Sequence, residues 1–585
     1  MLVTTLVRTA LTYPLHAWRA RRAHALIEAA MREANAGDTE RALRTLARAA
    51  ALEPHNAAIH ATAGRLHAEA KAYDAAKASF ERLLSFAPDY AEAHADLGSV
   101  CRLAGDYAEA EESYRRAVSL APDNAVARLG LGLMLVRRRA PTEALEHLRA
   151  AFRLKPDDGE VLKLLVETLV QTGSYAEACD TARAAVQSPS APYEAWISLG
   201  LAYRRTHRSK QALECYEEAA RHRPHDVEAM TNRGIALQDL GRLDEAFAAY
   251  DAALALAPGY ALARFHRSLC RLLTGDYAAG WPDYETRLMS EERVPRRDTL
   301  PRWDGGPLAN RPVLVYGEQG IGDEIMFASC LPELMRDAGG CVIECSPKLR
   351  RLFARSFPGA HVYAAGDAQS CATAVAAVHP EVEVPLGSLP LHYRASLSDF
   401  PRRTGYLHAD PGRVDAWRAK LEALGPGPKI GISWRGGTEQ SRVALRSIEL
   451  ERLRPLLETP GVHFVSLQYT DGAAAEVQAL IARGGPLVAH WPEALADYDE
   501  TAALVCALDL TISVCTAVVH LAGALGRPVW VMAPRAPEWR YGNQGEAMPW
   551  YPSARIFRQG DDSDWVAVLA RVAAELGATA RALSE

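Results

Sequence analysis

The 585-residue sequence lacks several features that would place it in a familiar class of protein. It contains no run of about 18 apolar residues, so we expect no membrane-spanning helix. It has no excess of positive charge: the formal net charge is −6, whereas a nucleic-acid partner would favour a basic surface. Its ten cysteines form no CxxC pair and show no regular spacing. Unpaired thiols in a reducing compartment, the cytoplasm, are therefore expected.

The N-terminal segment has an Ala-His-Ala sequence that looks like a signal-peptide cleavage site. However, Arg8 interrupts the apolar stretch, and the positive charges follow that stretch instead of preceding it. We therefore expect a capping helix over residues 1–20 and no signal peptide. With 49% hydrophobic and 24% charged residues, the composition is that of a globular protein. The length is too great for one core and predicts three or four units.

The sequence repeats itself every 34 residues. Four series share this period: prolines, small residues, alanines and mostly aromatic residues, namely Pro54, Pro88, Pro122, Pro156, Pro224 and Pro258; Gly64, Gly98, Gly132, Val166, Gly200 and Gly234; Ala42, Ala76, Ala110, Ala144, Ala178, Ala212 and Ala246; and Phe80, Tyr114, Leu148, Ala182, Tyr216, Tyr250 and Tyr284. The pattern predicts paired helices that approach closely at the small residues, with aromatic rings in the wedge between repeats. Proline ends each second helix, because it has no N–H donor. Such pairs must stack to bury their apolar faces.

This pattern resembles the tetratricopeptide repeat over residues 21–292. The resemblance implies an all-α solenoid that binds a protein or peptide along its concave face. A spacer or dimerisation arm is the alternative.

After Arg293 the helical period ends. Residues 293–310 are expected to be a linker rich in Pro, Gly and Arg. Strands alternating with helices then predict an α/β region with two Rossmann-like lobes. We place the lobes at 311–408 and 429–570, with an interlobe linker at 409–428 and a C-terminal helix end at 571–585. The strand VLVY runs into GEQGIGDE, and we expect a helix from about Ile325 to Asp337.

Several motifs, taken in order, resemble bacterial tetratricopeptide-repeat glycosyltransferases: GEQGIGDEIMF, ISWRGG, RSIEL, VSLQY, ISVCTAVVHLAGALGRPVWVMAP and PWYPSARIF. The second half looks like the heptosyltransferases, which have the two-lobed GT-B fold. The whole layout is similar to the repeat-containing flagellin glycosyltransferases. The resemblance implies a glycosyltransferase, metal-independent and inverting, that moves a sugar from a nucleotide-sugar co-substrate to Ser or Thr hydroxyls of a protein, with flagellin the leading candidate. It implies no cofactor and no bound metal.

The resemblance also implies roles for individual residues. Asp323 occupies the place of the proposed heptosyltransferase base, which takes the proton of the acceptor hydroxyl. Its alternative role is to cap the following helix, and Glu324 is the alternative carboxylate. Close approach of the backbone to the acceptor or to donor phosphates would be allowed by Gly317, Gly320 and Gly322.

The second lobe is expected to hold the donor. Ser513 and Thr516 lie where a strand meets a helix N-terminus, which suits a diphosphate. His520 lies one turn further along and is either a donor contact or a structural histidine. Arg435 is placed to neutralise leaving-group phosphate, or else forms a surface ion pair.

Other residues of this lobe have weaker assignments. Gln468 and Tyr469 are candidates for binding the base or ribose, and Arg446 for phosphate. Trp434 either stacks on a ligand or packs in the core.

Three functions stay open from the sequence: a protein glycosyltransferase, a lipopolysaccharide or small-molecule glycosyltransferase, and a non-catalytic scaffold. The first lobe is short, and Arg435 stands near the position where heptosyltransferases usually have a lysine. ADP-heptose therefore cannot be assumed as the donor, and UDP-GlcNAc or a CMP-linked nonulosonic acid is equally allowed.

Overall fold

The structure is a computed structural model that describes residues 2–188, 191–289, 300–437, 443–470, 472–560 and 564–584. The chain divides into two compact units, Met1–Arg223 and Pro224–Glu585. The predicted fold class is confirmed, because a helical solenoid is followed by an α/β region with two separate sheets. Residues 293–299 of the expected linker lie outside the described residues.

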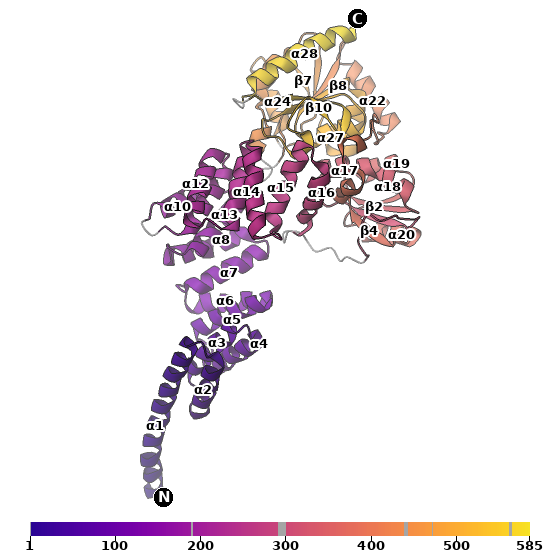
Figure 1. Cartoon of the computed structure of the whole chain (residues 1–585). Helices are drawn as coiled ribbons and strands as arrows, with labels where there is room; N and C mark the ends of the chain where they lie inside the picture. Colours follow the sequence, from indigo (N-terminus) through magenta and orange to yellow (C-terminus); the bar gives the residue numbers. More distant parts are fainter. Residues whose placement is uncertain are drawn as a thin grey trace. The chain divides into compact units, whose positions relative to one another are not determined.

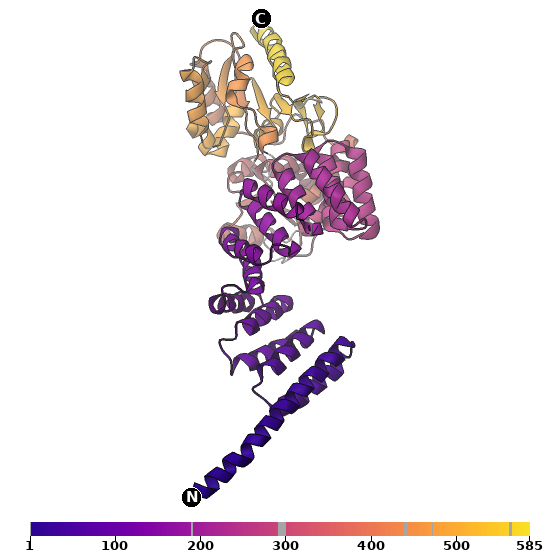
Figure 2. The same ribbon diagram turned by 90° about the vertical axis from the view of Figure 1, so that its left-hand side faces the viewer.

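The first unit consists of antiparallel helix pairs that stack in sequence order (Figure 1; Figure 2 shows the same pairs from the side). Its helices are α1 (Leu2–Asn35), α2 (Thr39–Leu52), α3 (Ala57–Glu69), α4 (Tyr73–Leu84), α5 (Ala91–Ala104), α6 (Tyr107–Leu120), α7 (Ala125–Arg137), α8 (Pro141–Leu154), α9 (Gly159–Gln171), α10 (Tyr175–Val186), α11 (Tyr193–Arg205) and α12 (Ser209–His222).

The repeating glycines and aromatic rings set the spacing of these helices. A Cβ atom built on Gly98 of α5 would lie 2.8 Å from the Tyr114 ring of α6, within the same repeat. The far side of that ring reaches the next repeat, where a Cβ atom on Gly130 of α7 would lie 2.3 Å from it. The ring therefore fills both the space inside one pair and the wedge between two pairs, and only glycine leaves room for it.

The turns between pairs also follow from the sequence. Pro122 comes two residues after the end of α6, as its missing N–H requires. Asn124 then caps α7, with its side-chain oxygen accepting the Ala127 N–H at 3.0 Å.

The second unit begins with the last helix pairs: α13 (Val227–Asp239), α14 (Leu243–Leu256), α15 (Ala261–Thr274) and α16 (Tyr277–Tyr284), followed by η1 (Glu285–Met289). These helices share a core with the α/β region. Trp281 is 1% exposed, lies 5.5 Å from the Trp539 ring and donates its indole N–H to the Arg394 carbonyl at 2.8 Å.

The first lobe has a four-stranded sheet in the order β3-β2-β1-β4, with parallel pairing throughout. Its elements are β1 (Val313–Tyr316), α17 (Ile321–Phe327), η2 (Ala328–Cys330), α18 (Leu331–Asp337), β2 (Cys341–Cys345), α19 (Arg350–Ser356), β3 (Ala360–Ala364), α20 (Ala368–Val378), β4 (Val382–Pro385), η3 (Leu386–Ser388), α21 (Leu389–Tyr393) and η4 (Leu397–Asp399).

The second lobe has a seven-stranded sheet in the order β10-β11-β9-β8-β5-β6-β7, parallel except for β10. Its elements are α22 (Pro411–Glu422), β5 (Lys429–Ser433), η6 (Val443–Arg446), η7 (Leu450–Leu453), α23 (Arg454–Leu457), β6 (His463–Ser466), α24 (Ala473–Ala482), β7 (Val488–Ala489), α25 (Pro492–Ala496), α26 (Tyr498–Ala507), β8 (Leu510–Val514), α27 (Ala517–Ala524), β9 (Val529–Ala533), η8 (Trp539–Tyr541), β10 (Ala547–Met548), β11 (Tyr551–Arg558) and α28 (Val566–Ser584). None of the described helices combines the length and hydropathy needed to cross a bilayer.

Two local expectations need correction. The helix after β1 begins at Ile321, not near Ile325, and Gly320 occupies its N-cap position. Asp323 therefore lies inside the first turn and does not cap the helix. The stretch 409–428, expected to be a linker, contains α22, where Trp417 donates its indole N–H to Glu500 of α26 at 2.8 Å.

Candidate functional site

The glycine-rich turn after β1 presents Asp323 to the second lobe. Its carboxylate forms an ion pair with the guanidinium of Arg540, which lies in η8. Both side chains are largely buried, with exposures of 21% and 15%. Burial opposes the charge of Arg540, but the carboxylates of Asp323 and Glu538 outweigh it and raise the pKa of the guanidinium. The candidate base is thus held by a cation from the other lobe.

Arg540 is one member of a row of alternating charges. Glu538 lies 3.8 Å from it and also forms an ion pair with Arg446 of η6. The row lies near the end of β8, because Gly322, the neighbour of Asp323, packs against Ala517, two residues after Cys515. Burial is the main cause that raises the pKa of the Cys515 thiol.

The row lies beside the carboxyl ends of β5 and β8. After β5 the chain continues to β6 on one side of β5, whereas after β8 it continues to β9 on the opposite side of the sheet. The topology therefore reverses between the neighbouring strands β5 and β8. Open α/β sheets bind their ligands in the crevice at such a point. The two strand ends approach closely, because a Cβ atom on Gly436 would lie 2.6 Å from the Cys515 carbonyl oxygen.

Ser513 and Thr516 lie at the end of β8 and at the start of α27, and both are buried and hydrogen-bonded. Their hydroxyls are 3.0 Å apart, and Thr516 caps α27 by accepting the Val518 N–H at 3.2 Å. They therefore shape the helix N-terminus in the structure.

His520 and Gly322 bring the two lobes together. His520 is 3% exposed and contacts the Tyr551 hydroxyl through Nδ1 at 3.1 Å. Burial, and then the charge of Arg540, holds its pKa well below the usual value, so the imidazole is neutral. A Cβ atom on Gly322 would lie 3.2 Å from the His520 ring and 3.3 Å from the Ala517 Cα. Gly322 thus permits the close packing of α17 on α27. In the structure its close neighbours are His520 and Ala517, whereas the sequence suggested an acceptor or donor phosphate.

Arg435 and Gln468 are bound to their own lobe. Arg435 forms an ion pair with Glu476, which also accepts the Trp434 indole N–H at 2.9 Å. Gln468 is 1% exposed, and its amide oxygen accepts the Arg435 backbone N–H at 2.8 Å. In this arrangement Gln468 joins the ends of β5 and β6, and Trp434 packs in the core.

Tyr469 and Glu324 differ from each other in exposure. Tyr469 is 51% exposed, so its ring is accessible to a base. Glu324 is 6% exposed, and burial raises its pKa to about 7. Its carboxylate accepts the Ser346 N–H at 2.8 Å and lies beside Gly317, where a Cβ atom would be 2.7 Å from the carboxyl carbon. A Cβ atom on Gly320 would have, among the described residues, only the Asp323 carboxylate within 4 Å.

The end of the solenoid supports the glycine-rich turn. Arg287 of η1 donates to the carboxylate of Glu318 at 2.9 Å, and Glu318 also accepts the Gly387 N–H at 3.1 Å. The Tyr284 hydroxyl donates to Gln319 at 3.1 Å. These bonds place solenoid residues between the carboxyl ends of β1 and β4, which is where the first sheet reverses its order.

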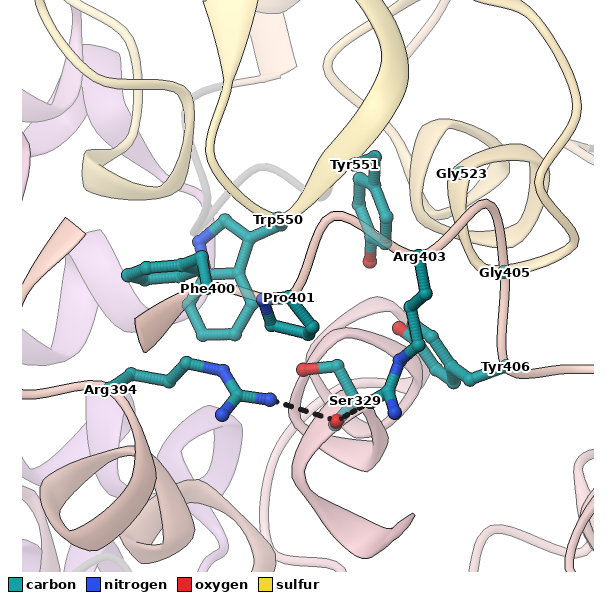
Figure 3. A pocket seen from close by; sticks show the side chains of 10 residues that line it. All are labelled: Ser329, Arg394, Phe400, Pro401, Arg403, Gly405, Tyr406, Gly523, Trp550 and Tyr551. Carbon is teal, nitrogen blue, oxygen red and sulfur yellow. Dashed lines mark hydrogen bonds between the residues drawn. The ribbon is translucent and has the colours of Figure 1, made fainter. Parts of the chain in front are cut away.

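A small pocket lies where the lobes meet (Figure 3). Arg394 and Arg403 both donate to the Ser329 carbonyl, opposite Trp550 and Tyr551 of the second lobe. Its free space is about 10 Å³, roughly that of one water molecule. A nucleotide sugar does not fit there.

The first unit has a groove of its own, about 430 Å³ in volume, between α11 and α12. Trp196, Leu199 and Tyr203 lie along one face of α11, at helical spacing. The other lining residues are Gln211, Glu214, Cys215, Glu217, Glu218 and Arg221. Three carboxylates against one guanidinium make the groove acidic.

Sequence reasoning missed Arg540 and Glu538. Both lie in the segment PEWRY, where a lone charged residue beside a tryptophan has no diagnostic spacing. The sequence offered one signal: the segment is separated from the strand PVWVMAP by two residues, at the edge of the sheet where functional side chains gather.

Comparisons with known proteins support the repeat assignment. Residues 27–91 and 197–261 match the family model described as Tetratricopeptide repeat. Residues 63–223 match the model described as Cilia and flagella-associated protein 70 middle TPR-like domain. The chain therefore contains tetratricopeptide repeats, as predicted.

The chain is also related to Protein FlbA of Caulobacter vibrioides. The two are 33% identical over 402 residues, which is 65% of this chain and 66% of that relative, just under two thirds of its length. This span is longer than Leu2–Met289, so the similarity extends beyond the repeats into the α/β region.

Solved structures with similarity include Pseudomonas aeruginosa pilF, with 19% identity, a TM-score of 0.32, and coverage of 36% of this chain and 96% of that one. A tetratricopeptide repeat protein from Parabacteroides merdae has 15% identity, a TM-score of 0.36, and coverage of 43% and 99%.

Proposed function

We propose that this protein is a glycosyltransferase that transfers a sugar from a nucleotide-sugar donor to Ser or Thr hydroxyls of a protein. The observation that carries the proposal is the position of Asp323. Its carboxylate, from the first lobe, pairs with Arg540 of the second lobe, and its helix α17 packs on α27, which begins where the topology of the second sheet reverses. A base on one lobe and an anion site on the other would bring an acceptor hydroxyl and a donor diphosphate together.

In this reaction the acceptor oxygen attacks the anomeric carbon while Asp323 takes its proton. The bond from the anomeric carbon to the phosphate oxygen breaks, and the nucleotide leaves with the electron pair. The N-terminus of α27 and the nearby guanidinium groups supply positive charge for the leaving group, so the geometry suits a metal-independent displacement with inversion.

The repeats supply the acceptor site. We propose that the acidic groove of Trp196, Leu199 and Tyr203 binds an extended segment of the acceptor that carries an apolar side chain and basic residues. Flagellin is the first acceptor to test, because the chain resembles repeat-containing flagellin glycosyltransferases. All ten cysteines are free, which fits a reducing, cytoplasmic setting.

The test is the intact mass of flagellin from cells with the wild-type protein, with Asp323→Asn, and with the gene deleted. A sugar mass that is present with the wild type and lost in both other strains supports the proposal. An unchanged mass in the deletion strain rejects flagellin as the acceptor and favours lipopolysaccharide transfer or a scaffold. If flagellin keeps the sugar mass in the Asp323→Asn strain but loses it in the deletion strain, Asp323 is rejected as the base.

A further inference from the structure

Arg540 lies between two carboxylates that come from different lobes. Asp323 reaches it from α17, and Glu538 from the segment just before η8. Together with Arg446, these side chains form a row of two cations and two anions. The set is largely buried, since the exposures of the four side chains lie between 10% and 21%.

The set is not fully satisfied. Among the described residues, Nε of Arg540 and Oε2 of Glu538 are buried without a hydrogen-bond partner. An unpaired guanidinium N–H is a donor without an acceptor, and burying it costs free energy. A ligand with more acceptor oxygens than one carboxylate would satisfy it.

A diphosphate has this chemistry. Its oxygens match the planar fork of a guanidinium, and it carries more negative charge than a carboxylate. The charge row lies near the N-terminus of α27, because Gly322, the neighbour of Asp323, packs against Ala517, the first residue of that helix. A helix N-terminus suits a phosphate. A diphosphate at the strand ends would therefore compete with Asp323 for Arg540.

We propose that Arg540 exchanges the carboxylate of Asp323 for the diphosphate of the donor, so that the base is released only when the donor is bound. The inference rests on the proposed function and adds an order of events: the donor binds before Asp323 is free to act as the base. Without a donor, the guanidinium of Arg540 holds Oδ1 of the Asp323 carboxylate. With a donor, Arg540 stabilises the leaving phosphate, and Asp323 is free to take the acceptor proton.

Linkage gives this exchange a measurable sign. If Asp323 and the diphosphate compete for one cation, removing the carboxylate charge must strengthen diphosphate binding. We expect Asp323→Asn to lower the Kd for UDP and for inorganic pyrophosphate by about 5-fold or more. A residue that only positioned the donor would give the opposite result.

A second interlobe ion pair supplies the control. Arg355 of α19 pairs with Asp499 of α26, as Asp323 pairs with Arg540. Asp499→Asn also removes one interlobe ion pair, but its partner does not belong to the charge row. This variant should leave both Kd values within about 2-fold of the wild type, because residues without shared partners act independently.

The experiment is calorimetric titration of UDP, ADP and pyrophosphate into the full chain for the wild type, Asp323→Asn, Asp499→Asn, Arg540→Lys and the Asp323→Asn/Arg540→Lys double variant. We expect tighter binding only for Asp323→Asn, and loss of that gain in the double variant. Unchanged or weaker binding to Asp323→Asn overturns the exchange, as does an equal gain with Asp499→Asn, which would mean general opening of the lobes.

The outcomes also separate this inference from the proposed function. If nucleotides bind but Asp323→Asn has no effect, the exchange is wrong and glycosyl transfer is unaffected. If no variant binds any of the three ligands, a diphosphate-linked donor is rejected, and the exchange with it. If Arg540→Lys fails to fold, the comparison of Asp323→Asn with Asp499→Asn decides alone.

Discussion

Burial of the Glu324 carboxyl makes the stability of the folded protein depend on pH. Its pKa is raised to about 7 in the folded protein, mainly by burial, against an ordinary value of 4.5. The folded state therefore binds a proton more tightly than the unfolded state between these values. Stability is greatest below about pH 4.5 with respect to this group, and it falls as the pH rises to 7.

Replacing this carboxyl with an amide should remove the pH dependence. Glu324→Gln keeps an oxygen to accept the Ser346 N–H and carries no charge. We expect the variant to be more stable than the wild type by about 1–3 kcal/mol at pH 8, and little changed at pH 5. Urea unfolding at the two pH values measures this. An equal shift at both would mean that the ionisation of Glu324 is not the cause.

Two glycines of the same turn provide a matched test of lobe packing. Gly322→Ala places a methyl group 3.3 Å from the Ala517 backbone, whereas Gly320→Ala meets only the Asp323 carboxylate at 3.5 Å. Overpacking between α17 and α27 should destabilise the first variant by about 1–3 kcal/mol. The second should unfold like the wild type. Denaturant unfolding compares them, and similar losses in both variants would contradict this account of Gly322.

At the scale of residues, the sequence could single out Asp323 but not the side chain that pairs with it. Asp323 was singled out, and it does face the other lobe. Its partner Arg540 lies 217 residues away, and no local pattern connects the two. Gln468 was a candidate ligand contact because it lies near the end of the motif VSLQY, and in the structure its amide joins the ends of β5 and β6. Such partners depend on tertiary packing that a single sequence does not show.

At the scale of elements, prediction was most successful where one strong pattern decided the structure. Buried parallel strands appear as short apolar runs, and β1 lies where the run VLVY predicted it. The helix start at Ile321 was missed because its first turn contains Gly322, and glycines were taken as part of the loop. Strand β11 was missed because Pro552 follows its first residue.

The groove between α11 and α12 is predicted to bind the acceptor protein. Trp196→Ala removes the largest apolar side chain of the groove, so we expect its Kd for flagellin to rise about 10-fold or more. Lys210→Ala, on the exposed face of α12, is the control and should bind normally. UDP affinity should be the same in all three proteins. Binding of each protein to surface-immobilised flagellin measures the Kd for flagellin. A Trp196→Ala variant that binds like the wild type would exclude this groove as the acceptor site.

At the scale of the whole molecule, the repeats and the α/β region are not divided where the helical pattern ends. The second compact unit begins at Pro224 and therefore includes α13–α16. Tyr277, Trp281 and Tyr284 belong to the same hydrophobic core as Phe327, Trp539 and Trp550. The final repeats are thus part of the core that supports the candidate site.

This shared core predicts which fragments of the chain can fold on their own. A fragment of residues 224–585 should fold and unfold in one cooperative transition, because it keeps the whole of this core. A fragment of residues 300–585 should aggregate and bind a hydrophobic dye, because it exposes the surface that Trp281 covers and loses the bond from its indole N–H to Arg394. Thermal unfolding and dye fluorescence compare the two fragments. If the shorter fragment folds cooperatively with similar stability, the last repeats are an appendage, and the bonds from Arg287 and Tyr284 to the glycine-rich turn do not determine the geometry of the site.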